Sequence, residues 1–240
     1  MNVVRYADRA DLMERRFEEL TRPTFPEYMN QSDVADLYWD RLYTDFADFQ
    51  VALVEGDDLL AEAHAVSLPW DGTLDDLPGG WEEGFLRGMT SDLPHTALMG
   101  IAISVAPAKQ GRQLSSRMIR TFTDNARAAG LGHGVVAPVR PTWKERYPLI
   151  DIERYAQWRR ADGSHFDPWL RIHELVGGRI VALAPESMTI RGSAEQWEEW
   201  TGMSFPEDGV YLFPGCLAPV TFSGGVGTHV EPNVWVHHQV

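Results

Sequence analysis

The sequence has 240 residues, of which 44% are hydrophobic, and this is enough for one large globular domain with a buried core. Its formal net charge of −14 excludes a protein whose main partner is nucleic acid or an anionic membrane, because binding phosphate backbones needs a large basic face. Cys216 is the only cysteine, which excludes an intramolecular disulfide and a cysteine-based zinc site and favours a cytoplasmic protein.

The first half of the chain predicts helices and a β-hairpin. Residues 3–6 are typical of a strand, and 11–20 and 33–43 of amphipathic helices. Two apolar runs, 49–54 and 59–68, flank a compact polar turn and predict a hairpin. Residues 70–96 then hold six acidic residues and several glycines and prolines. They predict an inserted loop with one short helix at 81–88, acting either as a lid or substrate wall or as a solvated excursion.

The centre of the chain predicts a βαβ crossover. Residues 98–105 form an apolar strand, 115–129 an amphipathic helix that ends at Gly130, and 135–139 the next strand. Strands joined in this way run parallel. Ligands of α/β sheets bind at the carboxyl ends of the strands, so the segment 107–116 is the expected ligand site.

The last third predicts two short helices and several strands. Asp167-Pro168 caps a helix over 168–176, and a strand follows at 179–183. Ser193 and Gln196 form a capping box that opens a helix over 194–200, in which Trp197 and Trp200 are expected in the core or at an interface. The closing strands are predicted at 210–213, 217–222 and 233–236, where they extend the sheet, cover the acceptor side or pair with another subunit.

The stretch 101–119 carries the clearest functional signal. A strand, a polar loop and a helix start follow one another, which is how α/β proteins build a cradle for a phosphate group. Residues 105–123 contain four basic residues and no acidic one, although the whole chain is acidic. We therefore expect a local anion site. The basic residues are Lys109, Arg112, Arg117 and Arg120.

Val105-Ala106-Pro107-Ala108-Lys109-Gln110-Gly111-Arg112-Gln113-Leu114-Ser115 resembles the signature loop of the GNAT acetyltransferase superfamily. The order of elements around it is also similar, including a short helix that ends in Gly177-Gly178 before another strand. The resemblance implies a mixed-sheet α/β fold with a GNAT-like acyl-CoA-binding domain over 1–185, into which 70–96 is inserted. Residues 186–240 would be a β-rich extension packed on the same domain.

The resemblance also implies where acetyl-CoA or another acyl-CoA binds as cosubstrate. Backbone N–H groups at the start of the helix would hold its pyrophosphate, and the strand backbone at Ile103 and Val105 would pair with its pantetheine arm. Lys109 and Arg112 would screen phosphate charge. Two glycines of the family pattern are replaced by Gln113 and Ser115, which requires negative φ angles there. The loop residues implied are Gln110, Gly111, Arg112, Gln113, Leu114, Ser115 and Ser116.

Acyl transfer from a thioester to an amine needs a base that takes a proton from the amine and an acid that protonates the departing thiolate. His173 stands where the family commonly has a tyrosine that serves as the acid for the thiolate, and an imidazole can also deliver a proton. A histidine on an apolar stripe is, however, often a core residue. Strand 98–105 contains no acid, but Glu62 and His64 share one face of the preceding strand and could supply the base. A solvated strand face is the alternative. Lys144, Tyr147 and Tyr155 are unranked candidates near the acceptor.

The sequence contains no Gly-x-Ser-x-Gly, His-Glu-x-x-His or Gly-x-x-x-x-Gly-Lys motif, and we expect no metal. It has no signal-peptide core and no run of roughly 18 apolar residues. We expect an acyl-CoA-dependent N-acetyltransferase with a small amine substrate, cationic if the acids of 71–92 face it. The alternatives are a module that binds acyl-CoA or acyl carrier protein without transfer, and an acyl-CoA decarboxylase. The sequence leaves open whether the protein forms a homodimer.

Overall fold

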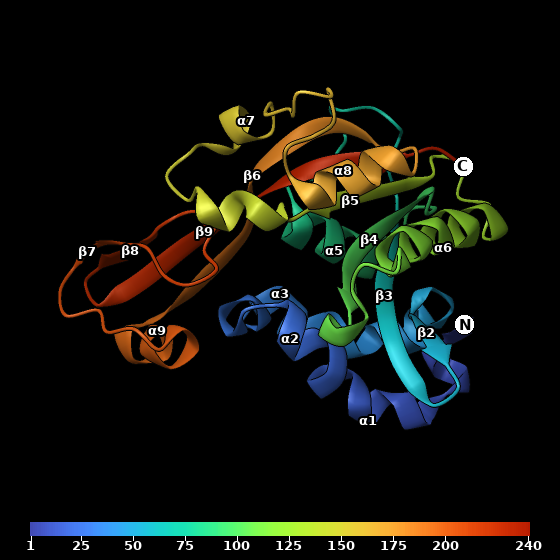
Figure 1. Ribbon diagram of the computed structural model, residues 1–240, viewed down its shortest axis with the longest axis horizontal. Helices are drawn as coiled ribbons and strands as arrows, with labels where there is room; N and C mark the ends of the chain where they lie inside the picture. Colours follow the sequence, from blue (N-terminus) through green and yellow to red (C-terminus); the bar gives the residue numbers. More distant parts are fainter.

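The computed structural model describes all residues from 1 to 240 and contains one nine-stranded mixed sheet with helices on both faces (Figure 1). The strand order is β1-β2-β3-β4-β5-β9-β8-β7, and β6 pairs with β9 off this path. The mixed α/β fold expected from the sequence is confirmed. The strands are β1 (Asn2–Arg5), β2 (Val51–Glu55), β3 (Asp58–Leu68), β4 (Ala97–Val105), β5 (Val135–Val139), β6 (Arg179–Ser193), β7 (Gly209–Tyr211), β8 (Val220–Ser223) and β9 (Val226–His238).

The longer helices lie where the sequence predicts them, whereas the N-terminal helices are broken into short turns. The α-helices are α1 (Met13–Arg16), α2 (Arg22–Thr24), α3 (Asp33–Tyr38), α4 (Leu42–Asp45), α5 (Trp81–Thr90), α6 (Leu114–Ala128), α7 (Ile152–Tyr155), α8 (Pro168–Leu175) and α9 (Ala194–Thr201). The 3-10 turns are η1 (Tyr6–Asp8), η2 (Ala10–Leu12), η4 (Glu27–Asn30), η5 (Trp39–Arg41), η6 (Ala47–Phe49), η7 (Pro107–Lys109) and η8 (Thr142–Arg146), and η3 (Phe17–Thr21) is a π-helical turn.

The two faces of the sheet are covered by different helices. Helices α6 and α8 lie on one face, where Leu98 of β4 packs with Met118 and Phe122 of α6 (Figure 1). On the other face Met99, the next residue of β4, packs with Trp81 and Phe85 of α5, which also contacts α3. Consecutive residues of β4 thus serve opposite cores, as expected for a strand buried on both faces.

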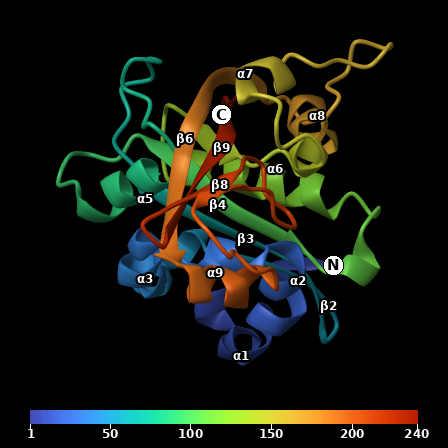
Figure 2. The ribbon, with the colours of Figure 1, turned by 90° about the vertical axis from the view of Figure 1, so that its left-hand side faces the viewer.

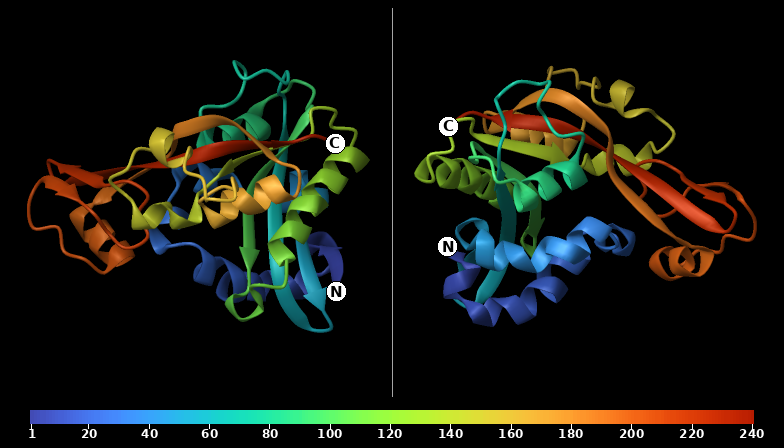
Figure 3. Two further views of the ribbon diagram at one scale, coloured as in Figure 1. Left: turned by 45° about the horizontal axis from the view of Figure 1, so that its top comes forward. Right: turned by 180° about the vertical axis from the view of Figure 1, so that it is seen from behind.

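Residues 186–240 add strands to the same sheet. Strand β9 pairs with β5 from Val135–His238 to Val139–Val234. Strand β6 pairs with β9 on both sides of residue 185, where the first domain was expected to end. The outer halves of β6 and β9, with α9, β7 and β8, form an arm that projects from the sheet (Figures 1 and 3) and faces the viewer in Figure 2. The predicted capping box at Ser193 is present and Trp197 is fully buried, which confirms its expected core position. The closing strands therefore extend the sheet.

The neighbouring strands β4 and β5 separate soon after they meet. They are parallel, as predicted, but pair only at Leu98–Val135 and Met99–Val136. A register shift in the β3–β4 ladder leaves Ile101 bulged between Gly100 and Ala102. From Gly100 onward the β4 edge that faces β5 has no strand partner, and this opening positions the site. None of the helices is long and apolar enough to cross a membrane.

Candidate active site

A cavity of about 870 Å³ begins at the split between β4 and β5. Its walls come from the N-terminal helices, the free edge of β4, the start of α6, the segment after β5, helix α8, and strands β6 and β9. Its polar lining residues include Arg16, Thr21, Asn30, Asp36, Asp40, Glu62, His64, Ser104, Gln110, Ser115, Arg140, Thr142, Glu145, His173, Glu231 and Asn233. One space therefore connects the loop after β4 with charged groups on the N-terminal helices.

Four of the residues expected to bind acyl-CoA line this cavity, namely Ile103, Val105, Gln110 and Ser115. The first turn of α6 has no side-chain cap and no acidic residue, so its N–H groups are free to bind an anion. Leu114 instead packs in the core beneath α6. The remaining loop residues do not line the cavity: Gly111, Arg112, Gln113 and Ser116.

The expectation that Gln113 keeps a negative φ is wrong. Its φ is 59° and its ψ is 23°, so it lies in the left-handed region just before α6 begins. Gly111 has a φ of 81°, and no atom lies near the position of an added Cβ. The loop therefore turns through two left-handed residues, and only one of them is glycine. The side chain of Gln113 is exposed and meets no packed neighbour, so the cost of this position lies in its backbone conformation.

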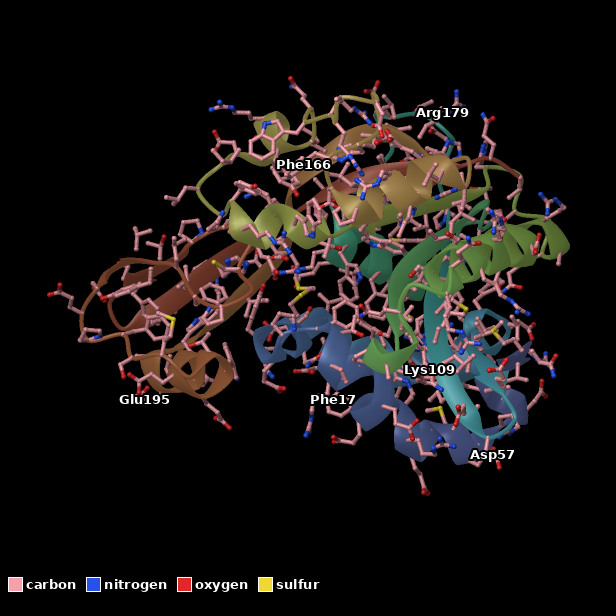
Figure 4. All side chains as sticks on the ribbon, in the orientation of Figure 1. Phe17, Asp57, Lys109, Phe166, Arg179 and Glu195 are labelled. Atoms are coloured by element: carbon pink, nitrogen blue, oxygen red, sulfur yellow. The ribbon has the colours of Figure 1, made fainter.

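The basic residues of the loop form ion pairs within the chain, and their expected role in screening phosphate charge stays a prediction. Lys109 forms an ion pair with Asp58 at 2.9 Å, and Arg112 pairs with Glu55 at 3.1 Å. Figure 4 shows Lys109 beside the hairpin turn that carries Asp57. Arg117 donates to the backbone carbonyl of Met1. These contacts tie the loop to the β2–β3 hairpin through exposed ion pairs, which are weak enough to give way to a bound phosphate.

The acidic insertion 70–96 is not a lid over the cavity: its helix α5 packs in the core, and residues 71–75 and 92–94 are exposed to solvent. Only Trp81 of this segment lines the cavity, and its Nε1 donates to the carbonyl of Ile101 at 2.9 Å, at the bulge where β4 leaves β5. None of the six acids of the segment lines the cavity, and two of them, Asp76 and Glu83, pair with Arg87. The expectation that these acids face a cationic acceptor is therefore wrong.

Other carboxylates line the cavity, and sequence reasoning missed them. Asp36 and Asp40 lie four residues apart on α3 and η5, and both are exposed. Glu145 of η8 is exposed on the same cavity. The nearby Arg41 pairs with Asp45, so it does not neutralise them. Unpaired carboxylates beside half-buried Trp39 can hold a cation through charge and through the aromatic face.

Glu62 and His64 lie together at the bottom of the cavity, and the alternative of a solvated strand face is wrong. Their side chains are 1% and 0% exposed. Glu62 accepts hydrogen bonds from Tyr6, Arg16 and Thr21. The π-helical turn η3 explains two of these contacts, because it aligns Arg16 and Thr21, five residues apart, on one carboxylate. Burial raises the pKa of Glu62, but His64 and Arg16 outweigh it and hold that pKa at about 2.

His64 is enclosed by aromatic rings and polar groups. Burial lowers its pKa, and Arg16 lowers it further, while Glu62 acts in the opposite direction. The imidazole is therefore neutral at physiological pH. Its Nε2 lies 3.0 Å from Glu62 Oε2 and 3.1 Å from Arg16 Nη2, and its Nδ1 lies 3.1 Å from Gln50 Oε1.

His173 lies in the cavity wall, but its surroundings do not favour an acid. Its Nδ1 lies 2.9 Å from Nε2 of His238, and Trp169 packs edge-on against it. Burial and His238 lower the pKa of His173 to about 3, so the imidazole is neutral and has no ready proton for a thiolate. Its Nε2 is buried without a partner. Its catalytic role stays a prediction, and the structure gives it little support.

The three unranked candidates of the segment after β5 do not line the cavity. Lys144 is buried and donates to the carbonyls of Tyr147 and Leu217, and Tyr155 donates to Asp167. Arg140, which sequence reasoning missed, does line the cavity. It pairs with buried Glu231 of β9. This pair joins the end of β5 to the arm.

The fold and the cavity together define a class: an α/β scaffold in which two diverging strands open a ligand site beside an uncapped helix N-terminus. No family model matches the chain. The curated arginine N-acetyltransferase of Aspergillus versicolor is 32% identical over 271 residues, covering 98% of this chain and 92% of that protein.

Two solved structures have a similar fold over nearly the whole chain. The loading GNATL domain of CurA from Lyngbya majuscula has a TM-score of 0.60 and 17% identity, covering 99% of this chain and 96% of that chain. The GphF GNAT-like decarboxylase in complex with isobutyryl-CoA has a TM-score of 0.59 and 18% identity, covering 100% and 99%. The chain belongs to the GNAT superfamily and is an N-acetyltransferase.

Proposed function

We propose that this N-acetyltransferase moves an acetyl or other short acyl group from acyl-CoA directly to a cationic amine or guanidine, with arginine or an arginine derivative as the first candidate. The observation that carries this proposal is the single cavity that joins the free edge of β4 to the carboxylates Asp36, Asp40 and Glu145. The arginine N-acetyltransferase activity named for the Aspergillus relative supports a cationic acceptor.

The cosubstrate would lie along β4 and the start of α6. Backbone groups of Ile103 and Val105 are available on an edge without a strand partner, and Gln110 and Ser115 line the cavity at the helix start. An extended chain with amide groups can pair with such an edge as an added strand does. The hydroxyl of Ser104 is buried on the cavity wall without a partner, so it is available to a ligand.

His64 would serve as the base, with Glu62 as its electrostatic partner. Nε2 of His64 takes a proton from the protonated acceptor nitrogen, and the lone pair that this leaves attacks the thioester carbonyl carbon. The carbon–sulfur bond breaks, and the nitrogen loses its second proton to water. Glu62 Oε2, 3.0 Å from Nε2, stabilises the imidazolium that forms. Arg16 Nη2 occupies the space beside Nε2 and moves aside when the acceptor arrives. The sulfur takes its proton from water.

Thiol release from acetyl-CoA with a panel of cationic and neutral amines tests this function. Release of the CoA thiol together with an acetylated cationic product is the expected result. Acetyl-CoA at a hundred times its dissociation constant should also stabilise the fold by about 2.7 kcal/mol. Stabilisation without thiol release from any pair of acyl-CoA and cationic amine would contradict the proposed transfer.

A further inference from the structure

The buried glutamine Gln50 is absent from every motif, yet it contacts the proposed base. It lies directly before β2 and is 0% exposed. Its Nε2 donates to the backbone carbonyls of Phe46 at 2.8 Å and Ala65 at 2.7 Å. Both amide hydrogens are therefore used, and the atom that faces the His64 ring must be the acceptor Oε1.

This arrangement bears on which nitrogen of His64 carries the proton. The acceptor oxygen of Gln50, 3.1 Å from Nδ1, and the Arg16 donor, 3.1 Å from Nε2, favour a hydrogen on Nδ1, whereas the Glu62 carboxylate, 3.0 Å from Nε2, favours the opposite tautomer. In the Nδ1–H tautomer, Nε2 has a lone pair that accepts from Arg16 Nη2. Glu62 Oε2 faces the same lone pair at 3.0 Å, so a proton that arrives at Nε2 is bonded at once to a carboxylate.

We propose that Gln50 is a positioning residue that holds His64 in the Nδ1–H tautomer, so that the lone pair of Nε2 can take the proton of the acceptor nitrogen once Arg16 Nη2 moves aside. This inference rests on the proposed function, because it assigns Gln50 a role only through the base. Without Gln50, Glu62 would be the stronger partner and would draw the single ring hydrogen to Nε2. The base would then be blocked by its own electrostatic partner.

The other groups packed on His64 do not compete for Nδ1. Tyr6 stacks on the ring with its centroid 5.7 Å away, and Tyr43 and Trp39 pack edge-on at 5.9 Å and 5.5 Å. Tyr6 donates its hydroxyl hydrogen to Glu62, and burial raises the pKa of Tyr43, so both phenols are neutral. Gln50 is the one hydrogen-bond partner of Nδ1.

The tautomer can be read directly from the nitrogen chemical shifts of ¹⁵N-histidine-labelled protein, with His64→Gln used for assignment. The expected result for the wild type is a protonated Nδ1 and an unprotonated Nε2. In Gln50→Leu the hydrogen should move to Nε2, and kcat should fall about 10- to 100-fold while the dissociation constant of acetyl-CoA stays unchanged. Ser67→Ala removes a hydrogen bond to another histidine, His95, outside the cavity, and is the matched control with unchanged kcat.

Three results would overturn the role of Gln50: a wild-type ring protonated at Nε2, a Gln50→Leu ring that keeps its hydrogen on Nδ1, or a shifted hydrogen with unchanged kcat. The wild-type spectrum decides the first point even if Gln50→Leu fails to fold. Absence of thiol release by the wild type would instead refute the proposed function, since the tautomer is measured without substrate.

Discussion

The affinity for a positively charged acceptor should depend on Asp36 and Asp40. Both carboxylates are exposed, line the cavity and lack a cationic partner within the chain. An exposed ion pair contributes up to about 1 kcal/mol, which corresponds to about fivefold in affinity. Asp36→Asn and Asp40→Asn should therefore each raise the KM for a cationic acceptor by up to about fivefold, and together by up to about 25-fold. The kcat should change little, because neither residue contacts the reacting atoms.

Steady-state thiol release at low and high salt measures this effect. Added salt should raise the wild-type KM and reduce the difference between the wild type and the double variant, because exposed charges are screened within about 10 Å at 0.1 M salt and about 3 Å at 1 M. Asp33→Asn removes an exposed carboxylate of the same helix that does not line the cavity, and it should leave KM unchanged. Equal KM values for the double variant and the Asp33 control would refute the assignment of the acceptor side.

Three stability predictions follow from the conformation and burial of particular residues. Gln113→Gly relieves a left-handed residue that costs about 1–2 kcal/mol, against about 0.5–1 kcal/mol of added chain entropy. The net gain of up to about 1.5 kcal/mol should raise the melting temperature by up to about 6 °C, and a melting temperature below that of the wild type would contradict the loop geometry. His173 and His238 have pKa values lowered to about 3 and 4, so below pH 6.5 the unfolded chain takes up protons that the native state refuses. Urea unfolding should therefore show a loss of about 2 kcal/mol per histidine by pH 5, and a flat profile would disagree. Arg140→Met leaves Glu231 buried without its cation and should cost about 3–5 kcal/mol in the same assay, whereas a loss below 1 kcal/mol would contradict the ion pair.

Local signals predicted most of the elements. The cap at Asp167, the capping box at Ser193 and the periodicity of the crossover helix each depend on neighbouring residues, and the structure has the corresponding elements. The N-terminal helices were predicted less well. The π-helical turn at Phe17–Thr21 is stabilised by a carboxylate on β3, some 40 residues further along the chain, which no local pattern reports.

The candidate site was predicted only in part, for the same reason. The cofactor loop and the Glu62–His64 pair could be found because their members are close in sequence. The acceptor side could not, because Asp36 and Asp40 meet Glu145 only after distant segments fold around one cavity. The pairing of Lys109 with the hairpin and the burial of His173 against His238 likewise arise from tertiary contacts.

The most direct test of the account is an incubation of the wild-type chain with acetyl-CoA and arginine or arginine derivatives, with CoA thiol and acetylated product measured together by absorbance and mass spectrometry. The account predicts equal amounts of thiol and N-acetylated cationic product, both reduced in Asp36→Asn/Asp40→Asn at acceptor concentrations below KM. Thiol release that is independent of any amine, or no release with any acyl-CoA and amine pair, would contradict it.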